Sequence, residues 1–395
     1  MASGMRKTLA IALPAAAIAA LVSMALIEAW VRLRWDDRRG TPGFYVSDPL
    51  LGQRLSPGYR GWFAGVPVEI NSLGFRDTRD YTLEKPPHTF RVVILGDSVT
   101  FGHGALSDTT YPYLLEQQLK AWRPDVNWQV WNLGVPGYNT AQELAYLRQV
   151  GERYRPDLVV VGFFENDLTG NELPEQPSVL RRASSAVQRV MQRWFYSYEL
   201  YKKVALTLRW RLFTPAAGRG RVEQLAGEEA LLARPDMSQR PEQRLTDVDQ
   251  FSDDFVCPER DDNPNRDRLT TTLSGESGEI AAWKRAVGRF QQLHRDGAYR
   301  VAFFINMAPN ECPEGDRFFD GGALEDEAAL RAILENGTPV GSSVRALLAY
   351  RPSQMPGASG HAIGNANRVK ARALFDFLRR DVLPALVPPL MAAPH

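Results

Sequence analysis

The sequence predicts an α/β protein in which helices cover both faces of a parallel β-sheet. Short runs rich in β-branched residues recur along the chain, and segments of helical length separate them. Strands that alternate with helices form βαβ units, whose parallel sheet is buried on both faces. A chain of 395 residues is long enough for one such domain with insertions. We therefore expect a three-layer α/β/α sandwich.

Four segments are predicted as strands of this sheet because they are short, apolar and bounded by turn residues. They are Arg91–Leu95, Trp128–Trp131, Leu158–Phe163 and Val301–Ile305. The pattern between and after them predicts helices at 110–122, 140–154 and 280–294, and a last helix that ends near residue 378. Ligands of such sheets bind at the carboxyl ends of the strands, so functional residues are sought there.

Residues 1–35 are predicted to form a single membrane-spanning helix. No charged residue occurs from Thr8 to Ile27, and a helix needs about 20 apolar residues to cross a bilayer. A cleaved signal peptide is the alternative, with Ser23-Met24-Ala25 as its cleavage site, although a signal core is usually shorter than this stretch. We favour an uncleaved anchor.

The side of the membrane on which the body lies follows from two opposing arguments. Arg6 and Lys7 precede the span, whereas four arginines follow it within residues 32–39, and the positive-inside rule alone would keep the body inside. Long domains cross membranes largely regardless of flanking charge, and the Asp36-Asp37 pair dilutes the basic cluster. We therefore expect the body to lie outside the cytoplasm.

Two regions lie outside the strand and helix alternation. Residues 36–90 are rich in glycine and proline and predict a cap of short strands and loops, so the sandwich occupies 91–170 and 279–385. Residues 171–278 form an insertion, which begins with a basic amphipathic helical segment at 178–214 and continues as an acidic surface loop. The basic segment is predicted to lie on an anionic membrane, to cover the active site, or to pack its apolar stripe on the core.

Cysteine and histidine usage limits the metal chemistry that the chain can perform. Cys257 and Cys312 are the only cysteines, and both precede proline in polar sequence. A disulfide between them fits an oxidising compartment, and two unpaired thiols are the alternative. Two cysteines cannot form a four-cysteine zinc site, and the five histidines contain no spaced metal-binding pair, so we expect no metal site.

Ser98 is the residue that first suggests a reaction. It stands in Gly96-Asp97-Ser98-Val99-Thr100, directly after the first predicted strand, where a turn exposes a side chain and brings backbone N–H donors near it. The segment differs from the G-x-S-x-G elbow, because Thr100 occupies the position of the second glycine. Alone, a serine after Gly-Asp is more typical of an ordinary turn than of a nucleophile.

Three further blocks lie on the same predicted edge of the sheet. Asn132–Asn139 follows the second strand, Phe164–Asp167 follows the third, and Gly360–Asn367 precedes the last helix. Together with the Ser98 segment, and in this order, they resemble the SGNH/GDSL hydrolase family over roughly 91–167 and 280–383. The segment Asn-Ser-Leu-Gly-Phe-Arg-Asp at 71–77 resembles the lead-in of membrane-anchored bacterial members of that family.

This resemblance implies a flavodoxin-like parallel sheet and a role for each matching residue. Ser98 matches the nucleophile and His361 the general base, while Ser98, Gly137 and Asn166 match the donors of the oxyanion hole. Gly134 is the less favoured choice for the oxyanion glycine. The chemistry agrees, because a serine needs an imidazole to take its proton, and donors aimed at the developing oxyanion stabilise the transition state.

The acid of the family's C-terminal motif is missing from this chain. The family places an aspartate two or three residues before the histidine, where this chain has Ser359 and Ala358. A backbone carbonyl of 357–360, or an aspartate from elsewhere such as Asp316 or Asp320, would then have to orient the ring of His361. In a serine protease, replacing this aspartate costs about 10⁴-fold in rate.

Two residues near the serine, Asp97 and His103, are further candidates for lining the site.

Together these inferences predict a serine esterase without a cofactor, anchored by a single span in a bacterial inner membrane and facing the periplasm or the outside. It would hydrolyse acyl or acetyl esters of cell-envelope glycans or lipids through an acyl-serine intermediate. An O-acetyltransferase on envelope glycans and a catalytically weakened scaffold or binding protein are the alternatives. With 47 basic and 46 acidic residues, the chain lacks the overall basic charge of a nucleic-acid binder, so we expect the ester substrate and the membrane as partners.

Overall fold

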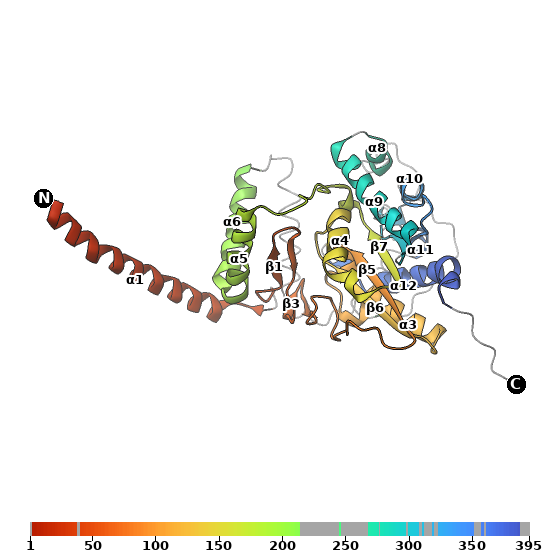
Figure 1. The fold of residues 1–395 in the computed structure, drawn as a ribbon, viewed down its shortest axis with the longest axis horizontal. Coiled ribbons are helices and arrows are strands. Elements are labelled where there is room, and N and C mark those ends of the chain that lie inside the picture. Colours follow the sequence, from red (N-terminus) through yellow and green to blue (C-terminus); the bar gives the residue numbers. More distant parts are fainter. Residues whose placement is uncertain are drawn as a thin grey trace.

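The computed structural model describes residues 2–37, 40–213, 245, 268–275, 277–297, 299–307, 310–311, 318–319, 323–350, 357–358 and 361–387. Its centre is a five-stranded parallel sheet in the order β11-β8-β7-β5-β6 (Figure 1). The strands are β5 (Thr89–Gly96), β6 (Asn127–Gly134), β7 (Leu158–Phe163), β8 (Arg300–Ile305) and β11 (Val340–Ser342). β5, the first strand of this sheet along the chain, lies between β6 and β7, as in flavodoxin-like sheets. The predicted fold class is therefore confirmed.

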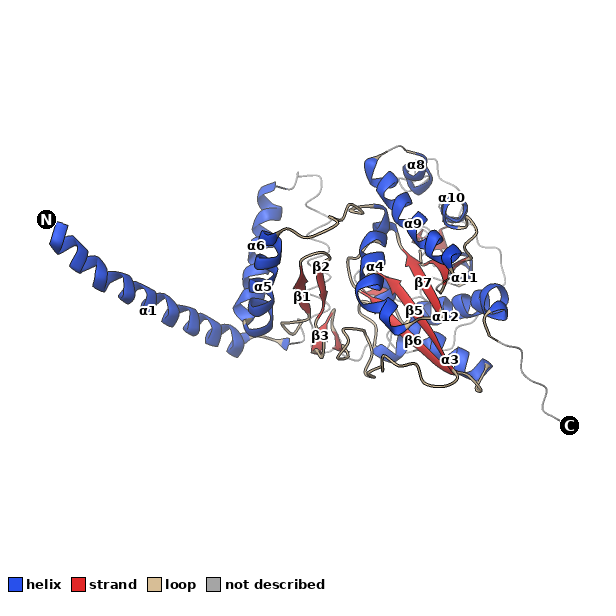
Figure 2. Cartoon of the chain, in the orientation of Figure 1, coloured by secondary structure: helices blue, strands red, loops and turns tan. Residues whose placement is uncertain are grey.

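Helices cover both faces of the sheet, each over its own hydrophobic core (Figure 2). On one face lie α3 (Tyr111–Trp122) and α12 (Asn365–Phe377), and on the other lie α4 (Thr140–Tyr146) and α9 (Gly278–Asp296). Side chains of a strand alternate between faces, so Val92 and Ile94 of β5 join the first core, whereas Val93 and Leu95 join the second. The predicted helix at 140–154 is shorter than expected, because α4 continues as a π turn, η3 (Leu147–Gly151), and a 3₁₀ turn, η4 (Glu152–Tyr154).

Shorter elements connect these layers and carry several of the residues discussed below. Around the carboxyl ends of the strands are α2 (Ser98–Phe101), η2 (Ser107–Thr109), η5 (Glu165–Leu168), β12 (Gly357–Ala358) and β13 (His361–Ala362). The remainder are α8 (Arg268–Ser274), β9 (Asn310–Glu311), β10 (Phe318–Phe319), α10 (Ala323–Leu334), α11 (Val344–Leu348), η9 (Leu378–Val382) and η10 (Leu383–Ala385).

The cap consists of two antiparallel hairpins that lie between the sandwich and the helices α5 (Val179–Trp194) and α6 (Tyr196–Phe213) (Figure 1). The first hairpin pairs β1 (Tyr45–Asp48) with β2 (Gly52–Leu55), and the second pairs β3 (Arg60–Phe63) with β4 (Val66–Glu69). Phe44, Val66 and Phe75 belong to the same hydrophobic core as Val93 of β5. The cap is therefore packed on the sandwich through a shared core.

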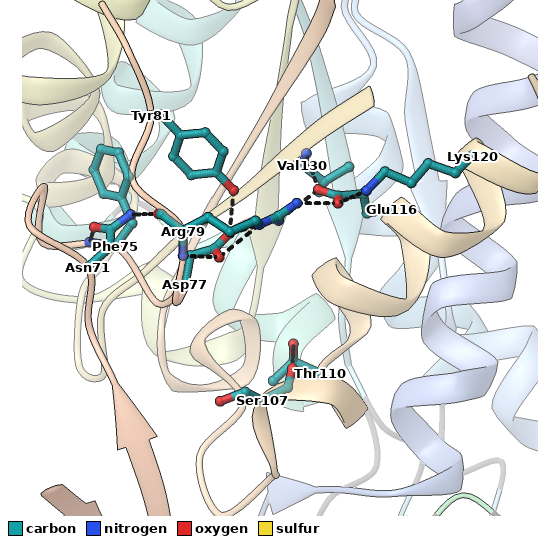
Figure 3. Close-up of polar contacts among 10 residues, drawn as sticks. All are labelled: Asn71, Phe75, Asp77, Arg79, Tyr81, Ser107, Thr110, Glu116, Lys120 and Val130. Atoms are coloured by element: carbon teal, nitrogen blue, oxygen red, sulfur yellow. Dashed lines mark hydrogen bonds and ion pairs between the residues drawn. The ribbon is translucent and has the colours of Figure 1, made fainter. Parts of the chain in front are cut away.

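A buried carboxylate ties the segment after the cap to the sandwich. Arg79 donates to the two carboxylate oxygens of Glu116 on α3 at 2.6 and 3.0 Å, and also to Asp77 (Figure 3). Glu116 is only 2% exposed, and it also accepts hydrogen bonds from the Val130 N–H of β6 and from Lys120. The Glu116 side chain thus links α3, β6 and the segment that contains Arg79.

The N-terminal helix α1 (Ala2–Arg34) extends away from the body (Figure 1). Its segment Pro14–Arg34 is long and apolar enough to cross a membrane. Near its end it meets the insertion helices α5 (Val179–Trp194) and α6 (Tyr196–Phe213). Glu28 accepts hydrogen bonds from the backbone N–H groups of Tyr196 and Ser197, at 3.0 and 2.9 Å, and so caps the start of α6. The acidic part of the insertion lies outside the described residues.

The apolar stripe of α5 faces away from the protein. Val187, Val190 and Trp194 are 64%, 55% and 60% exposed. The side that faces the cap is polar instead, because the buried Gln192 accepts a hydrogen bond from the Ser47 N–H of β1 at 2.8 Å. The alternative that this helix packs its stripe on the core is therefore wrong, because polar side chains occupy the contact with the cap.

Candidate active site

Glycines at the ends of β5 and β6 allow the short helix α2, which begins with Ser98, to pack against the sheet. Gly96, which ends β5, has a φ of +155°, and a Cβ there would clash with the side chain of Thr100. Gly134, its partner on β6, lies so close to α2 that a Cβ would clash with the backbone N of Phe101. Glycine at both positions therefore allows α2 to approach the carboxyl edge of the sheet, where Ser98 is its first residue.

Ser98 and His361 are in direct contact. The Oγ of Ser98 lies 2.7 Å from the Nε2 of His361, although the two residues are 263 positions apart in the sequence. His361 opens β13, which pairs with β12 in a small antiparallel hairpin, so that residue 358 lies opposite residue 361. A serine hydroxyl within hydrogen-bond reach of an imidazole is the arrangement that activates serine as a nucleophile.

Asp97 builds the turn on which Ser98 sits. It is 1% exposed, and its Oδ1 accepts the Val99 N–H at 2.8 Å, which caps α2. Its Oδ2 lies 3.3 Å from the Ser98 Oγ, farther than the imidazole of His361. Burial raises the pKa of Asp97 to about 6, against the hydrogen bonds from Val99 and Ser98 and the charge of Lys370, which lower it. Because a serine has one proton, the shorter contact to His361 is the better path for it.

The two candidate glycines differ in what their backbone N–H groups contact. The Gly134 N–H donates to the Oδ1 of Asn132 at 3.0 Å, so it is already engaged. The Gly137 N–H has no acceptor among the described residues, and Gly137 is exposed with a φ of +83°. These contacts favour Gly137 as the available donor.

Asn166 contacts Tyr138, the residue after Gly137. It belongs to η5, after β7, and its Nδ2 donates to the backbone carbonyl of Tyr138 at 3.1 Å. An amide nitrogen carries two hydrogens, so one N–H remains for a ligand. Since β6, β5 and β7 are adjacent and parallel, their carboxyl ends place Gly137, Ser98 and Asn166 at one edge of the sheet.

His103 is stacked on His361. The two ring centroids are 4.4 Å apart and the planes differ by 20°, while the ring of Phe63 meets His103 edge-on at 5.1 Å. Burial lowers the pKa of His103 to about 3, and the charges of His361 and Arg76 act in the same direction. His103 is therefore neutral at ordinary pH. The structure thus brings Asp97, Ser98, His103 and His361 together.

Several residues with predicted roles lie outside the described part of the chain. Cys257 and Cys312 are among them, so their disulfide stays a prediction. The same holds for Ser359, Asp316 and Asp320, and with them for the group that replaces the missing acid.

Sequence reasoning missed three buried ionisable residues around the site, of which Lys370 on α12 is the first. It is 1% exposed, and burial lowers its pKa to about 8 against the opposing effect of Asp97. Glu143 on α4 and Asp167 on η5 are also buried, and both oxygens of Glu143 lack a hydrogen-bond partner among the described residues. A charged residue flanked by apolar residues in a predicted helix, such as Lys370 between Val369 and Ala371, could have indicated a buried charge.

The buried pair Glu143 and Asp167 should make stability depend on pH. Burial raises both pKa values well above the usual range, and Asp167 raises that of Glu143 further. A carboxyl with a raised pKa favours the folded state while it is protonated. This contribution to stability is complete below the unfolded pKa values, about 4.3 for Glu143 and about 3.9 for Asp167, and is lost as pH rises through the pKa values of the folded protein. The Tm of the protein should therefore fall from mildly acidic to mildly alkaline pH.

Glu143→Gln tests this expectation, because glutamine stays neutral at every pH. We expect the variant to show a flatter dependence of Tm on pH than the unmodified protein, and a higher Tm on the alkaline side. Glu172→Gln is the matched control, since Glu172 is exposed. Equal slopes for the unmodified protein and Glu143→Gln would show that this carboxyl does not titrate in the fold.

The chain is similar to one family model and to several solved structures. The model of the GDSL-like lipase/acylhydrolase family matches residues 94–226. An acetylxylan esterase from Geobacillus stearothermophilus is similar in structure, at 11% identity over 73% of this chain and 94% of its own, with a TM-score of 0.38. An α/β hydrolase enzyme from the metagenome of Lake Arreo matches at 14% identity over 73% and 94%, with a TM-score of 0.35. At these scores neither likeness extends to individual residues. No curated protein matches the sequence.

Proposed function

We propose that this chain, which belongs to the GDSL-like lipase/acylhydrolase family through residues 94–226 and hydrolyses ester bonds, does so with Ser98 as its nucleophile. The observation that carries the proposal is the 2.7 Å contact between the Ser98 Oγ and the His361 Nε2. A scaffold that had lost its reaction would have no need to keep this contact, so catalysis is the better account of it.

The reaction proceeds in two steps through an acyl-serine. The Ser98 Oγ attacks the ester carbonyl carbon while the Nε2 of His361 accepts its proton, and the carbonyl oxygen becomes an oxyanion. The backbone N–H groups of Ser98 and Gly137 and the free amide hydrogen of Asn166 stabilise this charge. His361 then returns the proton to the departing alcohol. Water attacks the acyl-serine in the same way and releases the carboxylic acid.

We further propose that the substrates are acyl or acetyl esters of cell-envelope glycans or lipids, hydrolysed outside the cytoplasm. The support is the apolar helix Pro14–Arg34, which would restrict the enzyme to esters near a membrane. A tethered enzyme meets substrates attached to the same envelope at high effective concentration.

Labelling with a fluorophosphonate probe tests the proposed nucleophile. Such a probe reacts quickly only with an activated serine, so we expect one adduct on Ser98, located by peptide mapping of the full-length protein in detergent. His361→Ala should slow labelling strongly, because no base then takes the proton. Labelling of another serine, or equal rates in both proteins, would contradict the assignment.

We also propose that α5 lies on the lipid surface beside the anchor. Its exposed apolar residues are accompanied by arginines at 181, 182, 189 and 193, a composition typical of helices at an anionic membrane interface. The last residue of α5 lies close to the end of α1 in space, since Arg32 donates a hydrogen bond to the Trp194 carbonyl at 2.6 Å. The outward stripe would therefore meet the bilayer that α1 enters.

Lipids brominated along their acyl chains quench nearby tryptophans and can locate Trp194. In liposomes that contain the full-length protein, we expect the part of the fluorescence that Trp194→Phe removes to be strongly quenched. Trp122→Phe is the control, because Trp122 lies on α3 of the sandwich and its contribution should be unaffected. An unquenched Trp194 would place α5 away from the lipid.

A further inference from the structure

We propose that Asn171 is a positioning residue, which holds Gly137 and Asn166 at the spacing that an oxyanion requires. Asn171 follows η5 and is 7% exposed. It would act on two donors of the proposed oxyanion hole, so the inference rests on the proposed function and adds a residue to that site.

The two donors lie on loops that the sheet does not join directly. Gly137 follows β6 and Asn166 follows β7, and β5 lies between these two strands. The hydrogen bonds of the sheet hold each strand to β5, so contacts beyond the strand ends must set the distance between the two loops. Donors stabilise an oxyanion at about 2.7 to 3.1 Å, and this distance therefore matters for the rate.

Two hydrogen bonds join the loops close to the donors themselves. The Asn166 Nδ2 donates to the Tyr138 carbonyl at 3.1 Å, and the Asn139 Nδ2 donates to the Thr169 carbonyl at 3.0 Å. Asn166 is a proposed donor, and the Oδ1 of Asn139 caps α4 by accepting the Gln142 N–H. Substitution of either asparagine would therefore change more than the link between the loops.

Asn171 provides a third link and is not itself a proposed donor. Its Oδ1 accepts the Ala141 N–H of α4 at 3.0 Å. Its Nδ2 donates to the carbonyls of Asp167 and Thr169 at 2.6 and 3.3 Å. The oxygen of this amide thus binds the start of α4, and the nitrogen binds the loop that carries Asn166.

The bond to Ala141 satisfies a backbone group for which a helix has no internal partner. The first four N–H groups of an α-helix lack an intrahelical acceptor, and Ala141 is the second residue of α4. An acceptor from another loop fixes the start of the helix relative to that loop. Gly137 lies four positions before Ala141, so the position of its N–H depends on the same bond.

Two substitutions remove this link from its two sides. Asn171→Ala removes the acceptor, and Ala141→Pro removes the donor, because proline has no N–H. Proline is tolerated in the first turn of a helix, and α3 has Pro112 at the position that residue 141 occupies in α4.

Gln291→Ala is the matched control for the loss of a buried amide. Gln291 is 4% exposed, and its Nε2 donates to the carbonyls of Ile333 and Leu334 at 2.9 and 3.0 Å. These two residues precede β11, so they lie toward the amino ends of the strands, whereas Ser98 lies at the carboxyl ends.

We expect Asn171→Ala and Ala141→Pro each to lower kcat about ten- to a hundredfold, with little change in KM. The reason is that the oxyanion exists in the transition state and not in the bound ester. Gln291→Ala should lower the Tm but leave kcat unchanged. Each full-length protein is assayed in detergent for kcat and KM on p-nitrophenyl acetate and for Tm.

A double-mutant cycle with Asn166→Ala separates positioning from a general loss of structure. The spacing of two donors matters only while both are present. In the Asn166→Ala background, the fold loss of kcat caused by Asn171→Ala should therefore shrink by about threefold or more. Equal losses in the two backgrounds would overturn the inference, and so would an unchanged kcat in Asn171→Ala. If Asn171→Ala fails to fold, Ala141→Pro in the same two backgrounds decides.

These outcomes are distinguishable from a failure of the proposed function. If Ser98→Ala and Asn166→Ala are slow while Asn171→Ala is fully active, the proposed function stands and the positioning role is wrong. If Asn166→Ala keeps full kcat, the oxyanion role of that residue is wrong, and the positioning role is wrong with it. If Ser98→Ala is fully active, the proposed nucleophile itself is wrong.

Discussion

Ser98→Ala is expected to abolish ester hydrolysis by the full-length protein. Alanine has no hydroxyl to attack the carbonyl, and His361 then has no proton to take. Loss of the nucleophile costs about 10⁶-fold in a serine protease with a complete triad. The motif's aspartate is missing from this chain, and a lower starting rate would leave less to lose, so we expect a loss of about 10⁴-fold or more. Release of p-nitrophenol from p-nitrophenyl acetate measures it.

A serine close by provides the control for this experiment. Ser107 lies on η2, nine positions along the same segment, and its side chain is exposed. Ser107→Ala should retain full activity, which would exclude a general effect of serine replacement near the site. Normal turnover by Ser98→Ala would mean that another group performs the reaction.

Asn166→Ala should lower kcat by about 10² to 10³-fold while KM changes little. The amide hydrogen that is not bonded to Tyr138 is free to stabilise the oxyanion. That charge exists in the transition state and not in the bound ester, so its loss is seen in kcat. Steady-state kinetics on the same p-nitrophenyl ester provide both constants.

The variant also loses the hydrogen bond to Tyr138, so its fold must be checked. The Tm of Asn166→Ala should stay close to that of Asn336→Ala, which removes an exposed asparagine from the far side of the domain. A stable variant with an altered KM and an unchanged kcat would refute the oxyanion role.

Strands of the sheet could be predicted where both of their faces are buried, because such strands are continuous apolar runs in the sequence. Leu158–Phe163 is apolar throughout because neither face of β7 meets water. β11 went unpredicted, since Val340–Ser342 is three residues long and contains a glycine and a serine. Its position comes from pairing with β8, and such long-range pairing leaves no local signal.

The site was predictable from the order of its blocks but not from the properties of single residues. Ser98 and His361 could be expected to meet because each follows or precedes an element at the same edge. His103 is different, because its ring contacts Phe63 of the cap, 40 positions earlier. Similarly, helical spacing identified the apolar stripe of α5 but not the direction that it faces. Periodicity defines a face, whereas tertiary structure decides what covers it.

The hydrogen bonds of Glu116 make the unfolding of the sandwich depend on residues outside it. Removing residues 36–90, which comprise the cap and the segment after it, would take away Arg79, one of the two cations that neutralise a carboxylate exposed by only 2%. A buried charge that loses a partner costs several kcal/mol, a large share of the whole stability of a domain. Cap and sandwich should therefore melt in one calorimetric transition and resist proteolysis together. In that sense the hairpins of the cap are part of the smallest unit of this protein that can fold.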